Sequence, residues 1–159
     1  EESTYKSVVH NGEHLRPSDN DYDWLGNGIY FWENSYERAY EWAFAKYGKN
    51  AKVIGAILDL GYCLNLTDYA STDVLKRGYQ VLENMSRKYG LRIPENRKGR
   101  SKTDVLLRNL DCAVIQQIHE YNRRMNQPQY DSIRGMFTEG EETYPGSGFL
   151  EKRILRYAL

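Results

Sequence analysis

The spacing of apolar positions along the chain predicts four helices, because apolar side chains recur there every three or four residues. The predicted helices cover about residues 2–10, 35–47, 72–89 and 101–125. Asn11-Gly12 and Gly48 are typical helix ends, and Asn34 or Ser35 can cap the second helix. Ser101 and Asp104 form a capping-box pattern for the last one.

Strand patterns lie near both ends of the chain, with helices between them. The run "KVIGAILDL" (52–60) is almost continuously apolar, which predicts a buried strand. "DSIRGMF" (131–137) and "EKRILRYAL" (151–159) predict two more strands, joined by a stretch rich in turn residues. This order favours an α+β fold over a regular βαβ repeat. We therefore expect one domain over residues 1–159, trimmed at one or both ends because the chain lacks an initial Met and stops in a strand-like run.

Composition narrows the class of protein. Lysine plus arginine (22) balances aspartate plus glutamate (22), so the whole chain carries no electrostatic signature of nucleic-acid binding. A local basic loop over 92–102, with Arg97, Lys98, Arg100 and Lys102, could contact phosphates or an acidic partner, or could simply be solvated. Cys63 and Cys112 lack metal-ligand spacing and predict free thiols in a reducing, cytoplasmic compartment. No apolar run is long enough to predict a membrane span.

Several common catalytic motifs are missing from the sequence. It contains no phosphate-binding glycine loop of the two familiar kinds, no zinc-protease motif and no hydrolase nucleophile elbow. His10, His14 and His119 are too few and too scattered to predict a metal site. We therefore expect no metal.

One stretch, "LGNGIYFWENSYERAYEWA" (25–43), is recognisable. The matching positions are Gly26, Gly28, Ile29, Tyr30, Phe31 and Ala39. In this order they resemble the second motif of the ADP-ribosyltransferase superfamily, in the branch of the poly-ADP-ribose polymerases. The segments 53–66, 131–140 and 144–152 also look like a bacterial subgroup of small transferases, some of which act as toxins or in defence.

The resemblance implies a split β-sandwich of two small sheets with flanking helices, and NAD as the substrate that donates ADP-ribose. Tyr30 would stack on nicotinamide, with Gly28, Ile29, Phe31 and Trp32 forming the surrounding NAD-binding wall. Gly28, which has no Cβ, would let the ligand approach the backbone. A core-packing role for Trp32 and Trp42 is the alternative.

Breaking the nicotinamide–ribose bond passes through an oxocarbenium-like state, which requires a carboxylate. The resemblance implies that this residue lies at or just before a late strand. Glu139 and Glu151 both suit that position and stay open as alternatives, with Glu141 and Glu142 as weaker candidates. All four could instead be solvated loop acids.

The first motif of the superfamily is a strand that carries His or Arg. His10 is the candidate here, but it falls where the pattern predicts a helix end, so the anchoring residue is expected upstream of this chain. His14 and Arg16 are equivalent candidates for the anchoring residue, and Arg16 could reach a phosphate of NAD.

The expected function is transfer of ADP-ribose from NAD to a macromolecular acceptor, which could be RNA, DNA or protein. The resemblance further implies a bacterial toxin or anti-phage defence effector, restrained by an antitoxin protein, with no membrane involved. The alternative is a catalytically inactive NAD- or ADP-ribose-binding module, or a protein-interaction domain on the same fold.

Overall fold

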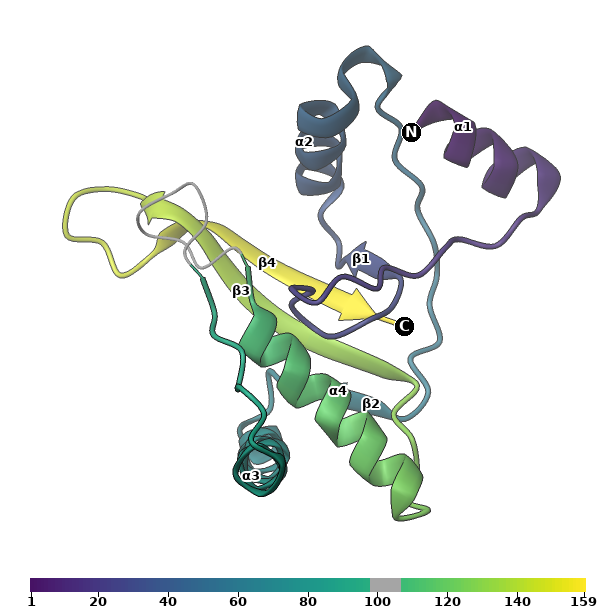
Figure 1. Ribbon diagram of the computed structural model, residues 1–159. Helices are drawn as coiled ribbons and strands as arrows, with labels where there is room; N and C mark the ends of the chain where they lie inside the picture. Colours follow the sequence, from purple (N-terminus) through teal and green to yellow (C-terminus); the bar gives the residue numbers. More distant parts are fainter. Residues whose placement is uncertain (98–106) are drawn as a thin grey trace.

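The computed structural model describes residues 1–97 and 107–159, with the side chains of 153 and 154 left aside. Its centre is a four-stranded sheet in the order β1-β4-β3-β2 (Figure 1). The strands are β1 (Tyr30–Trp32), β2 (Cys63–Asn65), β3 (Ser132–Glu142) and β4 (Leu150–Ala158). β1 and β3 both pair antiparallel with β4, whereas β2 runs parallel to β3.

Two long helices, α3 (Thr72–Tyr89) and α4 (Asn109–Arg124), pack against each other beside the sheet (Figure 1). Gly78 allows their close approach, since a Cβ there would come within 2.5 Å of Ile118 Cγ1. The buried core joins α4 to the sheet and to the loop before β1. It consists of Leu25, Leu64, Val114, Ile115, Ile118, Ile133 and Ala158.

Shorter elements complete the described chain. α1 (Glu2–Tyr5) continues into the π-helical turn η1 (Lys6–His10), and α2 (Tyr36–Tyr47) follows β1 directly and ends in η2 (Gly48–Asn50). A further single turn, η3 (Tyr69–Ser71), leads into α3. Figure 1 shows α1 and α2 on the opposite side of the sheet from α3.

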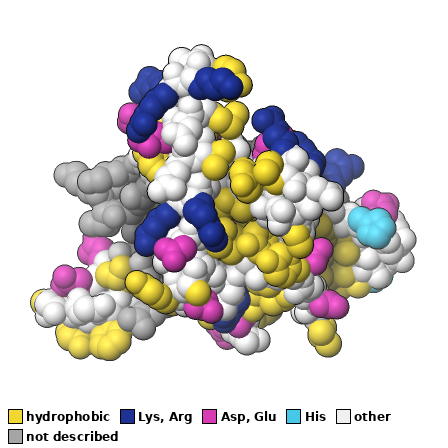
Figure 2. All heavy atoms as spheres, turned by 90° about the horizontal axis from the view of Figure 1, so that it is seen from below, with side chains coloured by type: hydrophobic (Ala, Val, Ile, Leu, Met, Phe, Trp, Pro, Cys, Tyr) yellow, Lys and Arg dark blue, Asp and Glu magenta, His cyan; other side chains and the backbone are white. Residues whose placement is uncertain are grey.

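The surface leaves many large apolar side chains uncovered. Figure 2, seen from below Figure 1, shows apolar side chains gathered across the middle of that face, with basic side chains around them. Tyr79 on α3 and Tyr121 on α4 are among the exposed ones. In the part of the chain that is described, no helix is long and apolar enough to cross a membrane.

Most predicted elements are present. The helices over 2–10, 35–47 and 72–89 are confirmed, as are the two late strands, although β3 extends five residues beyond the predicted end. Mixed α+β architecture is therefore confirmed. Cys63 and Cys112 are both free, as expected.

The prediction of a buried strand over 52–60 is wrong. The segment is extended but belongs to no strand, and Ile57 is fully exposed. An apolar run favours pairing, but it forms a strand only beside another strand edge. In the described chain the edge beside β3 is taken by β2, and 52–60 runs past the C-terminal end of β4 without pairing (Figure 1).

The last helix begins later than predicted. Arg108 has φ −103° and ψ 52°, so α4 starts at Asn109. Its cap comes from a distant residue, because the Asn96 side-chain oxygen accepts bonds from the backbone N–H groups of Leu110 and Asp111 (2.9 and 3.3 Å). The expected capping box at Ser101 and Asp104 lies outside the described residues, as do Lys98, Arg100 and Lys102 of the basic loop.

Candidate functional site

The glycine hinge before β1 is tied to the C-terminus of the chain. Gly28 exchanges two backbone hydrogen bonds with Ser18 (2.8 and 2.9 Å), and Ile29 does the same with Leu159 (2.9 and 3.2 Å). A Cβ on Gly28, at φ +156°, would lie 2.8 Å from the Leu159 carbonyl oxygen. The close approach expected at Gly28 therefore exists, but the group that approaches is the chain's own backbone.

Tyr30 fixes the shape of this hinge. Its hydroxyl donates to the Gly26 carbonyl oxygen (2.6 Å) and accepts from the Leu25 backbone N–H (2.8 Å). Burial raises the pKa of the Tyr30 hydroxyl well above its usual value. The phenol thus stays neutral, and its ring packs against the core while one side borders a cavity.

Trp32 leaves β1 on the same side as Tyr30, because alternate residues of a strand point to the same face. Its indole lies 5.5 Å from the ring of Trp42 on α2, measured between centroids. The Arg156 guanidinium of β4 lies over Trp32 and Trp24, at 5.3 and 4.6 Å from their ring centroids. The Trp32 indole N–H is buried and has no hydrogen-bond partner in the described structure.

Glu139 is held by two arginines. Its two carboxylate oxygens pair with Arg38 of α2 (2.5 Å) and Arg156 of β4 (3.0 Å), and only 8% of the residue is exposed. The resemblance pointed to a late-strand carboxylate, and Glu139 is the one that contacts the residues around Trp32. It reaches them through Arg156, not directly.

These residues border a cavity of about 490 Å³, which we call the basic cavity and define by Arg16, Tyr30, Trp32, Lys46 and Arg156. Trp42 and Tyr22 form further aromatic walls, and Asp23 is its acidic lining residue among those described. Lys46 lies over the Trp42 ring at 4.9 Å. Aromatic surfaces beside exposed basic groups suit a ligand that has both a planar ring and phosphates.

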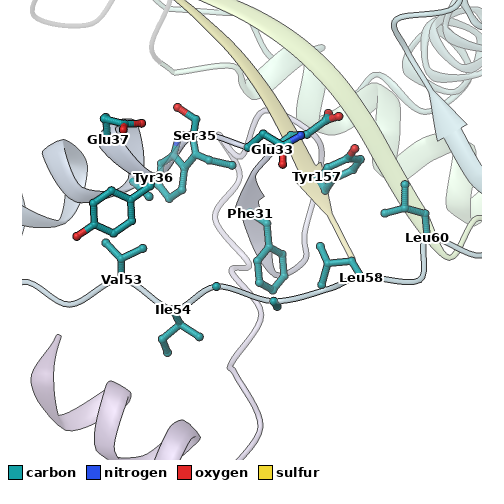
Figure 3. A pocket seen from close by; sticks show the side chains of 15 residues that line it. Phe31, Glu33, Ser35, Tyr36, Glu37, Val53, Ile54, Leu58, Leu60 and Tyr157 are labelled. Carbon is teal, nitrogen blue, oxygen red and sulfur yellow. The ribbon is translucent and has the colours of Figure 1, made fainter.

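A second cavity, of about 730 Å³, lies on the other side of β1, toward which Phe31 points. Figure 3 shows Phe31 directed toward the segment 53–60, with Glu33 and Tyr157 beside each other and Glu37 at the start of α2. We call this the acidic cavity and define it by Phe31, Glu33, Tyr36, Glu37 and Tyr157.

Glu33 has a fixed orientation in the acidic cavity. Arg134 donates to both of its carboxylate oxygens, from Nε to Oε2 (2.9 Å) and from Nη2 to Oε1 (3.1 Å). These bonds, with a further one from Tyr157, hold the pKa of the Glu33 carboxyl below its usual range. Arg134 also reaches the Thr67 hydroxyl (3.1 Å), so the pair is anchored to the loop after β2.

The other candidates lie apart from both cavities. Glu151 is exposed at the start of β4, where it packs beside Gly140. Glu141 and Glu142 are exposed at the end of β3, and Glu142 accepts from the Gly146 N–H (2.8 Å). His10 and His14 are exposed as well, and His10 ends η1 with its ring edge against Tyr5.

Of the residues that the sequence singled out, Tyr30, Trp32 and Arg16 all border the basic cavity. Sequence reasoning missed the arginines that organise the site: Arg38, Arg134 and Arg156. It also missed Glu33, although the residue follows the recognised strand directly. An acid placed one residue after an aromatic strand was the available signal.

No group of three or more potential metal-ligating side chains occurs among the described residues. In comparisons with protein-family models, with curated proteins and with solved structures, nothing matches this chain.

Proposed function

We propose that this chain binds NAD in the basic cavity and transfers its ADP-ribose to a macromolecular acceptor. The observation that carries the proposal is the grouping of Tyr30 and Trp32, from the recognised segment, with Arg16 and Lys46 around one cavity. The rings offer stacking surfaces to nicotinamide or adenine, and the two exposed cations complement the pyrophosphate.

The reaction needs few groups from the protein. The bond between nicotinamide and ribose C1′ breaks, and its electron pair leaves with neutral nicotinamide. A lone pair of the acceptor forms the new bond to C1′, and the acceptor's proton passes to a base or to water. A carboxylate stabilises the charge that develops on the ribose. Glu139 is the better candidate for this role, because Arg156 connects it to the basic cavity, whereas Glu151 is exposed elsewhere.

The proposal includes the finer expectations of the resemblance. The fold would be a split β-sandwich, with the described sheet as one of its two small sheets. The biological role would be that of a bacterial toxin or defence effector acting in the cytoplasm, with an antitoxin protein as its partner.

A second candidate function, binding of NAD or ADP-ribose without turnover, is favoured by one observation. Both oxygens of Glu139 already hold arginines, so the carboxylate must exchange one of these bonds before it can accept from a ribose hydroxyl. A module that only binds the nucleotide would need no such exchange.

Calorimetric titration with NAD tests the binding step. The double variant Arg16→Ala/Lys46→Ala should weaken binding by about a hundredfold, since each of the two lost charge-assisted contacts contributes about 1.5 kcal/mol. Lys49→Ala/Lys52→Ala is the matched control, because it removes two exposed charges outside the basic cavity. Equal loss in both variants, or no NAD binding at all, would contradict the site.

Incubation with labelled NAD and a cell extract then separates the two functions. Transfer predicts label on a macromolecule, and prior digestion of separate samples with nuclease or protease identifies its class. Glu139→Gln should abolish labelling, whereas Glu13→Gln, which changes an exposed acid that does not line the cavity, should not. NAD binding without label in any fraction would favour the non-catalytic module.

A further inference from the structure

The strand β1 separates two cavities whose linings differ in charge. The basic cavity has Arg16, Lys46 and Arg156 against Asp23. The acidic cavity has Glu33 and Glu37, and none of its described lining residues is Lys, Arg or His. A ligand with phosphates therefore fits the first cavity, and the second requires another kind of ligand.

Aromatic side chains form part of the wall of the acidic cavity. Phe31 points into it from β1, Tyr157 lies beside it on β4, and Tyr36 stands at the start of α2 (Figure 3). Aliphatic side chains of 53–60 close the remaining side. Aromatic faces attract cations through their quadrupoles, and the attraction strengthens where water is partly excluded.

The two carboxylates play different parts. Arg134 balances the charge of Glu33 and fixes its position, so Glu33 offers a directed oxygen but no net charge. Glu37 makes no ion pair within the described chain and is exposed in the first turn of α2. The negative charge of Glu37 offsets the positive end of the α2 helix dipole. The start of α2 therefore does not attract an anion into this cavity.

We propose that the acidic cavity binds an organic cation, the guanidinium or ammonium group at the end of a basic side chain of a protein partner. Such a group combines a delocalised or compact positive charge with an apolar stem. The charge would face Glu37 and the rings of Tyr36 and Phe31, and the stem would lie along the aliphatic wall at Leu58. Free inorganic cations do not match a lining in which aromatic and aliphatic groups predominate.

This site lies on the other side of β1 from the basic cavity, so its binding can be measured without NAD. Its role in the proposed reaction, to hold the basic side chain of a protein acceptor, rests on the proposed function. The two claims can therefore fail separately: cation binding is measured without NAD, and NAD binding is measured without a cation.

The test is a titration of the ¹⁵N-labelled chain with the blocked amides of arginine, lysine and citrulline, in the absence of NAD. Citrulline has nearly the shape of arginine but no charge. The arginine or lysine amide should shift the backbone signals of Ser35, Tyr36 and Leu58, and citrulline should shift them at least about fivefold more weakly. The stronger of the two cationic amides identifies the preferred group.

Two variants and their controls complete the test. Glu37→Gln and Tyr36→Ala should each weaken cation binding about fivefold, whereas Glu13→Gln and Tyr69→Ala, at exposed positions outside the cavity, should leave it unchanged. Circular dichroism checks that the variants keep their fold. Three results would each overturn the proposal. They are equal binding of the citrulline amide, an unchanged affinity of Glu37→Gln for the cationic amides, and shifts of the backbone signals at all exposed acidic residues.

Discussion

Arg134 and Glu33 form a two-bond ion pair that joins the start of β3 to the residue directly after β1, across a sequence separation of 101 residues. β4 lies between these strands in the sheet, so the pair bridges over Tyr157. Paired bonds of this kind fix two side chains more firmly than a single contact does. The pair therefore fixes one wall of the acidic cavity.

Removing this pair should lower stability in a pH-dependent way. Arg134→Leu should cost about 1–2 kcal/mol of unfolding free energy at pH 7, measured by urea denaturation. The pKa of Glu33 is lowered in the folded state, so its contribution is present above the unfolded pKa of about 4.3 and is lost as pH falls toward the folded value. The variant should therefore lose less stability than the wild type on acidification below about pH 4. Lys76→Leu, in an exposed pair with Asp73, should change stability by less than about 0.5 kcal/mol.

Tyr30→Phe should destabilise the fold even though the ring remains. The variant leaves the Leu25 N–H and the Gly26 carbonyl without their partner in a buried place, since Leu25 is only 1% exposed. We expect a loss of about 1–3 kcal/mol. Tyr69→Phe, at a position 87% exposed, should be neutral in the same urea titration. A neutral Tyr30→Phe would show that the two bonds do not fix the hinge.

The raised pKa of the Tyr30 hydroxyl should be visible in the stability of the protein at alkaline pH. A hydroxyl whose folded pKa lies above the unfolded value stabilises the protein fully below the unfolded pKa of about 10, and this contribution is lost as pH rises further. Absorbance titration should therefore show Tyr30 ionising only with unfolding. In Tyr30→Phe, the phase of tyrosine ionisation that accompanies alkaline unfolding should be smaller by one residue.

Gly28→Ala should be among the most damaging small substitutions. The new methyl group would meet the Leu159 carbonyl oxygen at 2.8 Å, on a backbone conformation that favours glycine. We expect about 2–4 kcal/mol of destabilisation and a correspondingly lower Tm. Gly148→Ala has open space around the added Cβ and provides the control, which should stay within about 0.5 kcal/mol of the wild type.

Glu139→Gln should be costly for stability as well as for the proposed transfer. It leaves Arg38 and Arg156 facing each other without the carboxylate, in a place where both side chains are largely buried. Breaking such a buried pair costs about 3 kcal/mol or more. Chemical denaturation, measured alongside the labelling assay, separates the two effects. If the variant is folded at low temperature but does not label the acceptor, the loss of labelling is due to the reaction and not to unfolding. Glu141→Gln, at an exposed position on the same strand, should not alter the unfolding free energy measurably.

Local signals in the sequence were enough for the first three helices and for the β3–β4 pair. Gly48 and Gly90 mark helix ends, and the alternating runs near the C-terminus mark strands. Segment 52–60 shows where local reasoning fails, because a strand depends on a neighbouring edge that the run itself does not encode. The start of α4 failed for a related reason, since Asn96 caps it from 13 residues before Asn109.

The candidate site was predictable only in part. The segment that holds Tyr30 and Trp32 was recognisable because its residues are consecutive. The arginines that surround it come from α2, β3 and β4, and each looks like an ordinary surface residue in the sequence. Only the antiparallel register, in which Trp32 lies opposite Arg156, brings these residues together.

Trp32 borders both cavities at once. A ligand in one cavity that shifts this indole changes the free energy of ligand binding in the other cavity. Thermodynamic linkage makes this effect reciprocal. If a nucleotide in the basic cavity changes the cation's dissociation constant by some factor, the cation must change the nucleotide's by the same factor. Phe31 borders both cavities as well, so two shared side chains give them a direct route by which the binding of one ligand can affect the binding of the other.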